Sequence, residues 1–158
     1  MRNIVLARVD DRLIHGEVVS VWTPSLSVNC IIVIDDIVAK DMFNTRVLKA
    51  LAPSGVKIEI YSVSDGVDAL KAEGNSKERV MILTKTPIVF DKLHDQGVEL
   101  KEVNLGGMGI RNERKPFIKN VACDDSEIES IRNLTNKGVH VYYQLVPEQK
   151  VIEVTSYI

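Results

Sequence analysis

The chain has 158 residues, with 20 Lys and Arg against 22 Asp and Glu, which gives a formal net charge of −2 at pH 7. Its apolar fraction of 45% is ordinary for a soluble globular protein. This balance excludes a disordered tail and an overall basic nucleic-acid binder. No apolar run approaches the roughly 18 residues of a membrane span, and the N-terminus does not resemble a signal peptide. We therefore expect one cytoplasmic domain, residues 1–158.

Short β-branched runs alternate with longer segments of helical periodicity. The predicted strands are residues 4–7, 31–34, 57–61, 80–84, 102–105 and 139–145. Helices are predicted over 39–51, 66–72, 88–95 and 124–137, with a further one starting near Glu17.

Capping residues support these boundaries. Ser64-Asp65 and Thr86-Pro87 are typical of helix starts, and Gly138 is typical of a helix end. In the helix over 39–51, five apolar residues fall on one predicted core-facing face: Met42, Phe43, Val47, Leu48 and Leu51. The alternation predicts an α/β fold with a single domain, in which an open, mostly parallel, twisted sheet carries helices on both faces.

In such sheets, chemistry gathers outside the carboxyl ends of the strands. The turn after the first predicted strand, residues 8–16, contains two arginines, two aspartates and a histidine. Lys85 follows the fourth strand, and a glycine cluster at 106–109 follows the fifth. We expect these segments to meet at one edge of the sheet.

Three kinds of site compete for this edge. A dinucleotide site requires a glycine-rich turn after the first strand, and that turn is here filled with charged side chains. A Mg²⁺-dependent, receiver-like domain phosphorylated on an aspartate fits the acidic pairs Asp10-Asp11 and Asp35-Asp36. However, a receiver carries its acceptor aspartate after the third strand, where this chain has no carboxylate before Asp65.

The third alternative makes His15 the reactive group. A neutral imidazole is a good nucleophile near pH 7, and a phosphoryl group on its nitrogen keeps a high transfer potential. Arg8 or Arg12 could hold the phosphoryl oxygens, and Asp10 could accept the N–H of the other ring nitrogen. The positive end of the following helix and the small Gly16 also suit an anionic group. Equally, His15 could be an ordinary polar residue at a helix start.

The segment from Arg8 to Val18 closely resembles the active-site segment of the IIB components of the mannose/fructose/sorbose family of the sugar phosphotransferase system. Further landmarks of that family follow in order along the whole chain: Trp22-Thr23, Ile32–Asp36, Ala52–Lys57, Lys85–Pro87, Asn104–Met108 and Gln144–Pro147. Family members often carry other residues where this chain has Glu17 and Glu113, which bears on partner contact or sugar preference.

The resemblance implies a phosphoenolpyruvate-dependent phosphotransferase of the cytoplasm, peripherally associated with membrane permease components. It implies catalytic roles for His15 as the phosphohistidine, Asp10 as its orienting group and Arg12 as a phosphoryl-holding group. Arg8, Gly16 and Lys85 are further phosphate-binding candidates. The implied partners are a phosphorylated IIA protein or domain, the membrane IIC and IID components and a sugar, with a homodimer also common in the family.

The remaining reactive residue types indicate structural roles. Cys30 and Cys123 lack metal-ligand spacing and are expected to be reduced and buried. We expect no metal, no cofactor and no nucleic-acid partner. Trp22 is expected in the core, while His94 and His140 carry no functional signal. Leu13 and Ile14, which precede His15, are candidate contacts for a protein partner.

Overall fold

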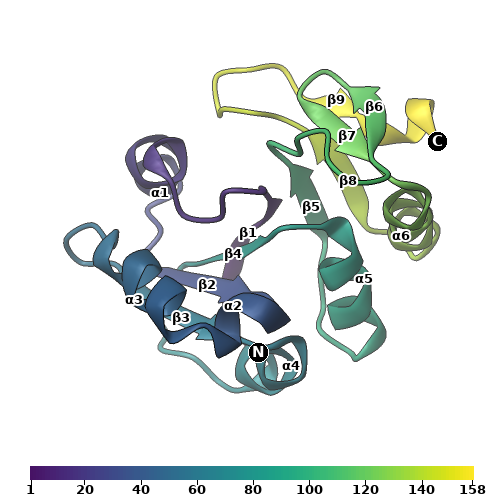
Figure 1. Ribbon diagram of the computed structural model, residues 1–158. Coiled ribbons are helices and arrows are strands. Elements are labelled where there is room, and N and C mark those ends of the chain that lie inside the picture. Colours follow the sequence, from purple (N-terminus) through teal and green to yellow (C-terminus); the bar gives the residue numbers. More distant parts are fainter.

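Seven strands form the central sheet in the computed structural model, which describes residues 1–158, in the order β3-β2-β4-β1-β5-β8-β9. Their bounds are β1 Ile4–Val9, β2 Cys30–Ile34, β3 Lys57–Tyr61, β4 Val80–Thr84, β5 Glu102–Leu105, β8 His140–Tyr143 and β9 Ile152–Glu153. All neighbours pair in parallel except β8 and β9. The predicted α/β fold with a mostly parallel sheet is therefore confirmed (Figure 1).

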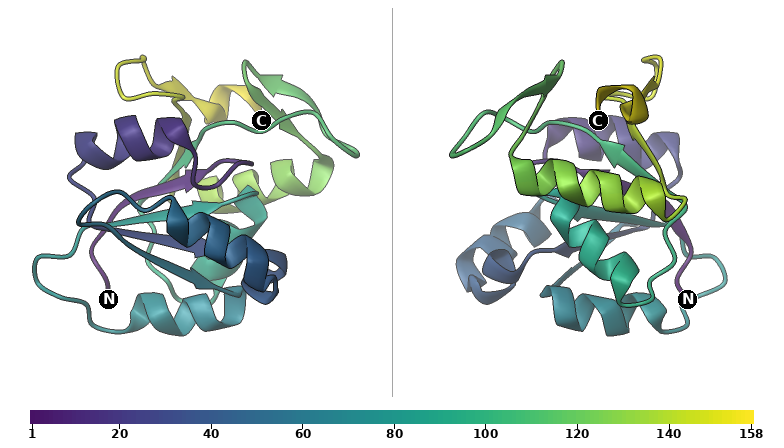
Figure 2. Two further views of the ribbon diagram at one scale, coloured as in Figure 1. Left: turned by 60° about the vertical axis from the view of Figure 1, so that its left-hand side comes forward. Right: turned by 90° about the vertical axis from the view of Figure 1, so that its right-hand side faces the viewer.

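Helices cover both faces of this sheet (Figures 1 and 2). On one face lie the π-helical turn η1 Val18–Trp22 and the helices α1 Thr23–Ser25, α2 Asp36–Lys40 and α3 Met42–Ala50. On the other face lie α4 Val63–Lys71, α5 Pro87–Asp95 and α6 Asp125–Asn136. The buried β2 and β4 separate two apolar clusters, because successive side chains of a strand point to opposite faces.

The prediction of one helix over 39–51 is wrong, because two helices, α2 and α3, occupy this region and the first begins before residue 39. Asp35 caps α2 by accepting from the backbone N–H groups of Ile37 and Val38, so that helix begins at Asp36. Asp41 then adopts an extended conformation and caps α3 through the N–H of Asn44. Only Leu48 of the predicted apolar face is buried, and Phe43 is 76% exposed.

Smaller differences affect other boundaries. Ser62, rather than Ser64-Asp65, caps α4 through the N–H of Asp65. Strand β8 stops at Tyr143, two residues short of its predicted end. The hairpin of β6 Lys115–Ile118 and β7 Val121–Cys123, the strand β9 and the 3₁₀ turn η2 Val154–Tyr157 were not predicted. These segments are short, and pairing with distant residues rather than local periodicity defines them.

The topology makes the carboxyl end of β1 the natural place for a site. Strand β1 lies between β4 and β5 in the sheet. The connection from β1 to β2 runs to one side of β1, whereas the connection from β4 to β5 runs to the other side. Such a switch in strand order opens a crevice outside the strand ends. None of the helices has the length and apolar character needed to cross a membrane.

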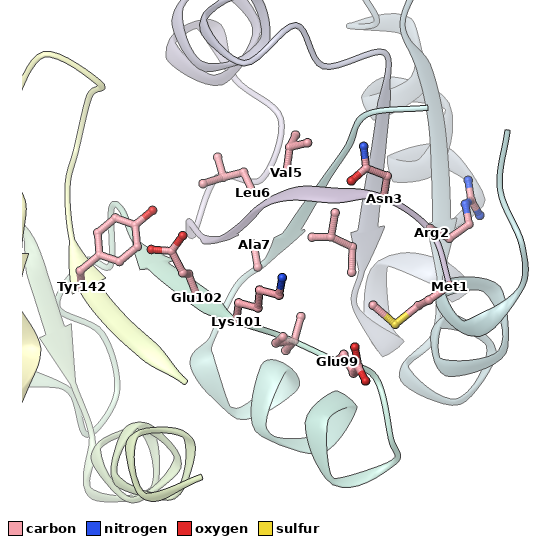
Figure 3. A pocket seen from close by; sticks show the side chains of 12 residues that line it. Met1, Arg2, Asn3, Val5, Leu6, Ala7, Glu99, Lys101, Glu102 and Tyr142 are labelled. Atoms are coloured by element: carbon pink, nitrogen blue, oxygen red, sulfur yellow. The ribbon is translucent and has the colours of Figure 1, made fainter. Parts of the chain in front are cut away.

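A cavity of about 300 Å³ lies elsewhere, near the amino ends of β1 and β5 (Figure 3). It exists because β1 pairs with β5 only at Arg8–Asn104 and Val9–Leu105, so the two strands diverge below these pairs. Tyr142 and Glu102 line one side of it. His15 is not part of its lining, so the cavity is separate from the carboxyl-end residues described below.

Candidate active site

The turn after β1 is tied to both neighbouring strands. The N–H of Asp10 donates to the carbonyl of Thr84 at 2.8 Å, and the N–H of Asp11 donates to the carbonyl of Gly107 at 2.9 Å. The chain reverses at Leu13, which has a φ of 55° and a buried side chain. A left-handed conformation costs a non-glycine residue about 1 kcal/mol or more. Burial of Leu13 offsets that strain and fixes the path that leads to His15.

His15 is held by Asp10. Its Nε2 lies 2.9 Å from Oδ2 of Asp10, and the imidazole side chain is 9% exposed. The other ring nitrogen, Nδ1, is shielded from solvent and has no hydrogen-bond partner. An ionised carboxylate accepts only, so Nε2 carries the proton, and in the neutral ring Nδ1 carries a free lone pair. This is the tautomer that a nucleophilic Nδ1 requires.

Asp10 is ionised in this arrangement. Burial opposes its charge, but hydrogen bonds from His15 and from the N–H of Arg12, together with the charge of Arg8, lower the pKa of Asp10. Because the pKa of Asp10 is lowered, its side chain is the ionised carboxylate at neutral pH.

Arg8 is fully buried and contacts the same carboxylate oxygen of Asp10 as His15 does. Its Nη2 donates to Oδ2 of Asp10 at 3.3 Å and to the carbonyl of Leu145 at 3.1 Å. Its Nη1 donates to Oδ1 of Asn104 at 2.5 Å and to the carbonyl of Gln144 at 3.0 Å. Both terminal nitrogens therefore have acceptors inside the protein, and the guanidinium has no exposed surface for a ligand.

Arg12, Gly16 and Lys85 lie on the open side. The side chain of Arg12 is exposed and forms no ion pair, while its backbone N–H donates to Oδ1 of Asp10 at 3.1 Å. A Cβ at Gly16 would meet no atom within 4 Å, so the space beside it is empty. Lys85 directly follows β4 at the same edge and is half-buried.

The helix that follows His15 spans residues 16–25 and includes the π-helical turn η1. The N–H groups of Gly16 and Glu17 have no acceptor in the protein. Unpaired N–H groups at a helix start favour an anion. These N–H groups and the exposed Arg12 are therefore candidates for binding an anion beside His15.

Asp11 has a different environment from Asp10. It accepts from Arg114 at 2.9 Å, from Arg111 at 2.9 Å and from the N–H of Gly109 at 2.6 Å. Asp35 is occupied as a helix cap, and Asp36 accepts from the N–H of Val63. The four acids therefore do not converge as the receiver-like alternative requires, and the strand order also differs from the 2-1-3-4-5 order of such folds.

One group of possible metal ligands lies at the amino end of the sheet, far from His15 in the topology: Cys30, Glu59 and Glu78. Arg2 donates hydrogen bonds to all three of these side chains. Burial and the nearby Glu59 raise the pKa of the Cys30 thiol to about 12. Cys123 is also buried, and its thiol pKa is likewise raised to about 12. Neither cysteine has the properties of a reactive thiolate.

Several contributors to the site were not predicted as such. Trp22, expected only as a core residue, stacks over the guanidinium of Arg8 at 5.0 Å and donates from Nε1 to the carbonyl of Leu145. A Cβ at Gly106 would lie 2.4 Å from that guanidinium, so only glycine fits there. Asn104 and Gly106 fall within the landmarks of the family resemblance, and Gly106 also belongs to the glycine cluster that was expected at this edge of the sheet. Leu13 and Ile14 are buried, so the expectation that they contact a partner is wrong for this structure.

Comparison with known proteins places these residues in a family context. The model of the sorbose subfamily IIB component of the phosphotransferase system, PTS, matches residues 4–158. The fructose-specific EIIB component of the PTS from Bacillus subtilis (strain 168) is 35% identical over 147 residues, which cover 93% of this chain and 90% of that protein. The mannose-specific EIIAB component from Escherichia coli (strain K12) is 34% identical over 97% of this chain and 48% of its own length.

Solved structures agree with the sequence matches. The crystal structure of the IIBSor domain of the sorbose permease from Klebsiella pneumoniae has a TM-score of 0.92 and 31% identity. The alignment covers 98% of this chain and 95% of that domain.

Proposed function

The chain belongs to the IIB components of the sorbose subfamily of the phosphotransferase system, and from that premise we propose that His15 accepts and donates the phosphoryl group through Nδ1. The observation that carries this proposal is the unequal pairing of its two ring nitrogens. Nε2 is bound to Asp10, whereas Nδ1 has a free lone pair beside an unpaired helix start.

The first transfer needs no external base. Nδ1 attacks phosphorus, the bond to the donor's nitrogen breaks, and the donor keeps that electron pair. The phosphorylated ring retains its Nε2 proton and gains positive charge, which the Asp10 carboxylate stabilises. Arg12 and the N–H groups of Gly16 and Glu17 bind the phosphoryl oxygens, and Lys85 adds positive charge at the same edge.

The donor is a phosphorylated IIA protein or domain, and the acceptor is a sugar presented by membrane IIC and IID components. In the second transfer, a sugar hydroxyl attacks phosphorus, the bond to Nδ1 breaks, and the hydroxyl proton passes to solvent or to the partner. The similarity to a protein named as an EIIAB component and to a domain of a sorbose permease supports these partner classes. Residues 1–158 are proposed to act as one IIB domain.

Phosphorylation of the purified chain tests this proposal. The chain is incubated with phosphoenolpyruvate, the general phosphotransferase proteins and a IIA partner, and the product is analysed by intact mass and fragmentation. A single phosphate on His15, stable in alkali and lost in acid, is the expected result. The variant His15→Ala should fold normally and remain unmodified. A phosphate lost in both acid and alkali indicates an aspartate and would overturn the assignment.

A further inference from the structure

Two buried side-chain nitrogens in the whole chain lack a hydrogen-bond partner, and both belong to the same cluster: His15 Nδ1 and Arg8 Nε. A buried polar atom without a hydrogen-bond partner is unfavourable. The proposed function explains the free nitrogen of His15, but not the burial of Arg8. Arg8 therefore needs a separate explanation.

Arg8 is fixed by groups from three distant parts of the chain. Asn104 lies on β5, the carbonyls of Gln144 and Leu145 follow β8, and Trp22 lies at the end of η1. Gly106 provides the space that the guanidinium occupies. The fork of Arg8 satisfies four acceptors in fixed directions, which a flexible ammonium group could not reproduce.

We infer that Arg8 is a positioning residue, which holds Asp10 so that His15 keeps its proton on Nε2 and presents an unprotonated Nδ1 to the phosphoryl donor. This inference deepens the proposed function and rests on it. It replaces the expectation that Arg8 binds the phosphoryl group, because all of its terminal N–H donors already face acceptors inside the protein.

The physical argument is that the carboxylate of Asp10 must be held in one orientation. A carboxylate that is free to rotate can accept a hydrogen bond from either ring nitrogen, and a proton on Nδ1 leaves no lone pair there. Nη2 of Arg8 lies 3.3 Å from the same Oδ2 that binds Nε2 of His15, and it holds the carboxylate so that the ring proton stays on Nε2. The other titratable groups near Arg8 are Glu17, on the same helix as η1, and Tyr142, on β8. Tyr142 is neutral near pH 7, since burial raises its pKa to about 12.

The test compares three variants of the full chain. Arg8→Met removes the charge and the hydrogen bonds, and Arg8→Lys keeps the charge without the fork. Arg2→Met is the matched control, because Arg2 is another largely buried arginine bound to carboxylates, at the opposite end of the sheet. Two readouts are taken: the ¹⁵N shifts of the His15 ring against pH without any phosphoryl donor, and the rate of phosphorylation against pH.

In Arg8→Met, the tautomer of His15 that carries the proton on Nδ1 should gain population, and phosphorylation should slow about tenfold. In Arg8→Lys, the change in tautomer should be smaller. Arg2→Met should change neither readout. If Arg8→Met leaves the ring shifts unchanged and slows phosphorylation equally at every pH, Arg8 acts on the phosphoryl group and the inference is overturned.

A second variant covers the case in which Arg8→Met does not fold. Gly106→Ala keeps every charge but displaces the guanidinium of Arg8, and it should shift the His15 ring signals in the same direction. Unchanged ring signals in a folded Gly106→Ala protein also overturn the inference. Because the ring signals need no donor, a parent protein that is never phosphorylated contradicts the proposed function alone.

Discussion

Oδ1 of Asp11 lies 2.9 Å from Nη1 of Arg114, which is 103 residues further along the chain. The same guanidinium donates from Nε to Oε1 of Glu127 at 2.8 Å and from Nη2 to the carbonyl of Lys85 at 3.2 Å. Asp11 and Glu127 surround Arg114 and raise its pKa against the opposing effect of burial. One arginine thus joins the His15 turn, the end of β4 and the start of α6.

Removal of this arginine should destabilise the fold. The variant Arg114→Met leaves Glu127, which is 2% exposed, without its cation, and this should lower the free energy of unfolding by about 3 kcal/mol. Urea denaturation measures the change. Arg132→Met is the matched control, because Arg132 forms an exposed pair with Glu129 and its loss should change stability by under about 0.5 kcal/mol. Equal effects of the two variants would contradict the role given to Arg114.

The variant Asp10→Asn should fold but transfer slowly. An amide can still contact His15, but it no longer fixes the proton on Nε2 or stabilises the charge of the phosphorylated ring. We expect phosphorylation to slow by about 10- to 100-fold, as for other groups that orient a functional histidine. Rapid-quench measurement of phosphorylated protein gives the rate. A rate within twofold of the parent would show that Asp10 does not orient His15.

Glu59 should contribute to acid sensitivity. Burial opposes its charge, but hydrogen bonds from Arg2 and Tyr61 outweigh that effect and lower its pKa from 4.5 to about 2. A lowered pKa stabilises the fold at pH values above 4.5, and this stabilisation is lost as pH falls toward 2. We expect a loss of about 1–2 kcal/mol over that range, since solvent screens part of the pair.

Urea denaturation at several pH values between 7 and 2.5 measures this effect. In the variant Glu59→Gln, stability at pH 7 should be lower and its dependence on pH shallower. A slope identical to that of the parent would show that other carboxylates account for the acid sensitivity.

His140 should give the opposite dependence on pH. Its ring nitrogens contact Glu102 of β5 and Glu153 of β9, at 2.9 and 2.6 Å. Partial burial lowers its pKa, but the two carboxylates outweigh this and raise it above 6.5. The stabilisation is therefore complete below pH 6.5 and is lost as pH rises through the raised pKa. Protection of the β9 amides, measured relative to the intrinsic exchange rate at each pH, should fall over that range, and in His140→Gln this protection should not depend on pH.

The sequence by itself determined the elements that local chemistry specifies. A buried parallel strand appears as a continuous apolar run, so β4 has the predicted bounds. The shorter apolar patterns of β3 and β5 also match their predicted ranges. Asp124 and Glu127 form a capping box at the start of α6, which begins one residue after the start predicted from periodicity. The segment from Arg8 to Val18 carried enough family-specific residues to predict the family and to single out His15 as the candidate reactive residue.

Tertiary structure decided how the charged residues divide their roles. Arg8 and Arg12 are four residues apart and equivalent by type, yet β5 and the segment after β8 enclose one while the other faces solvent. Asp10 and Asp11 are adjacent, yet one binds His15 and the other binds Arg114. His15 lies five residues from Asp10 in the sequence, whereas Arg114 lies 103 residues from Asp11. Local sequence patterns carry no record of such contacts, because only strand order and packing bring those partners together.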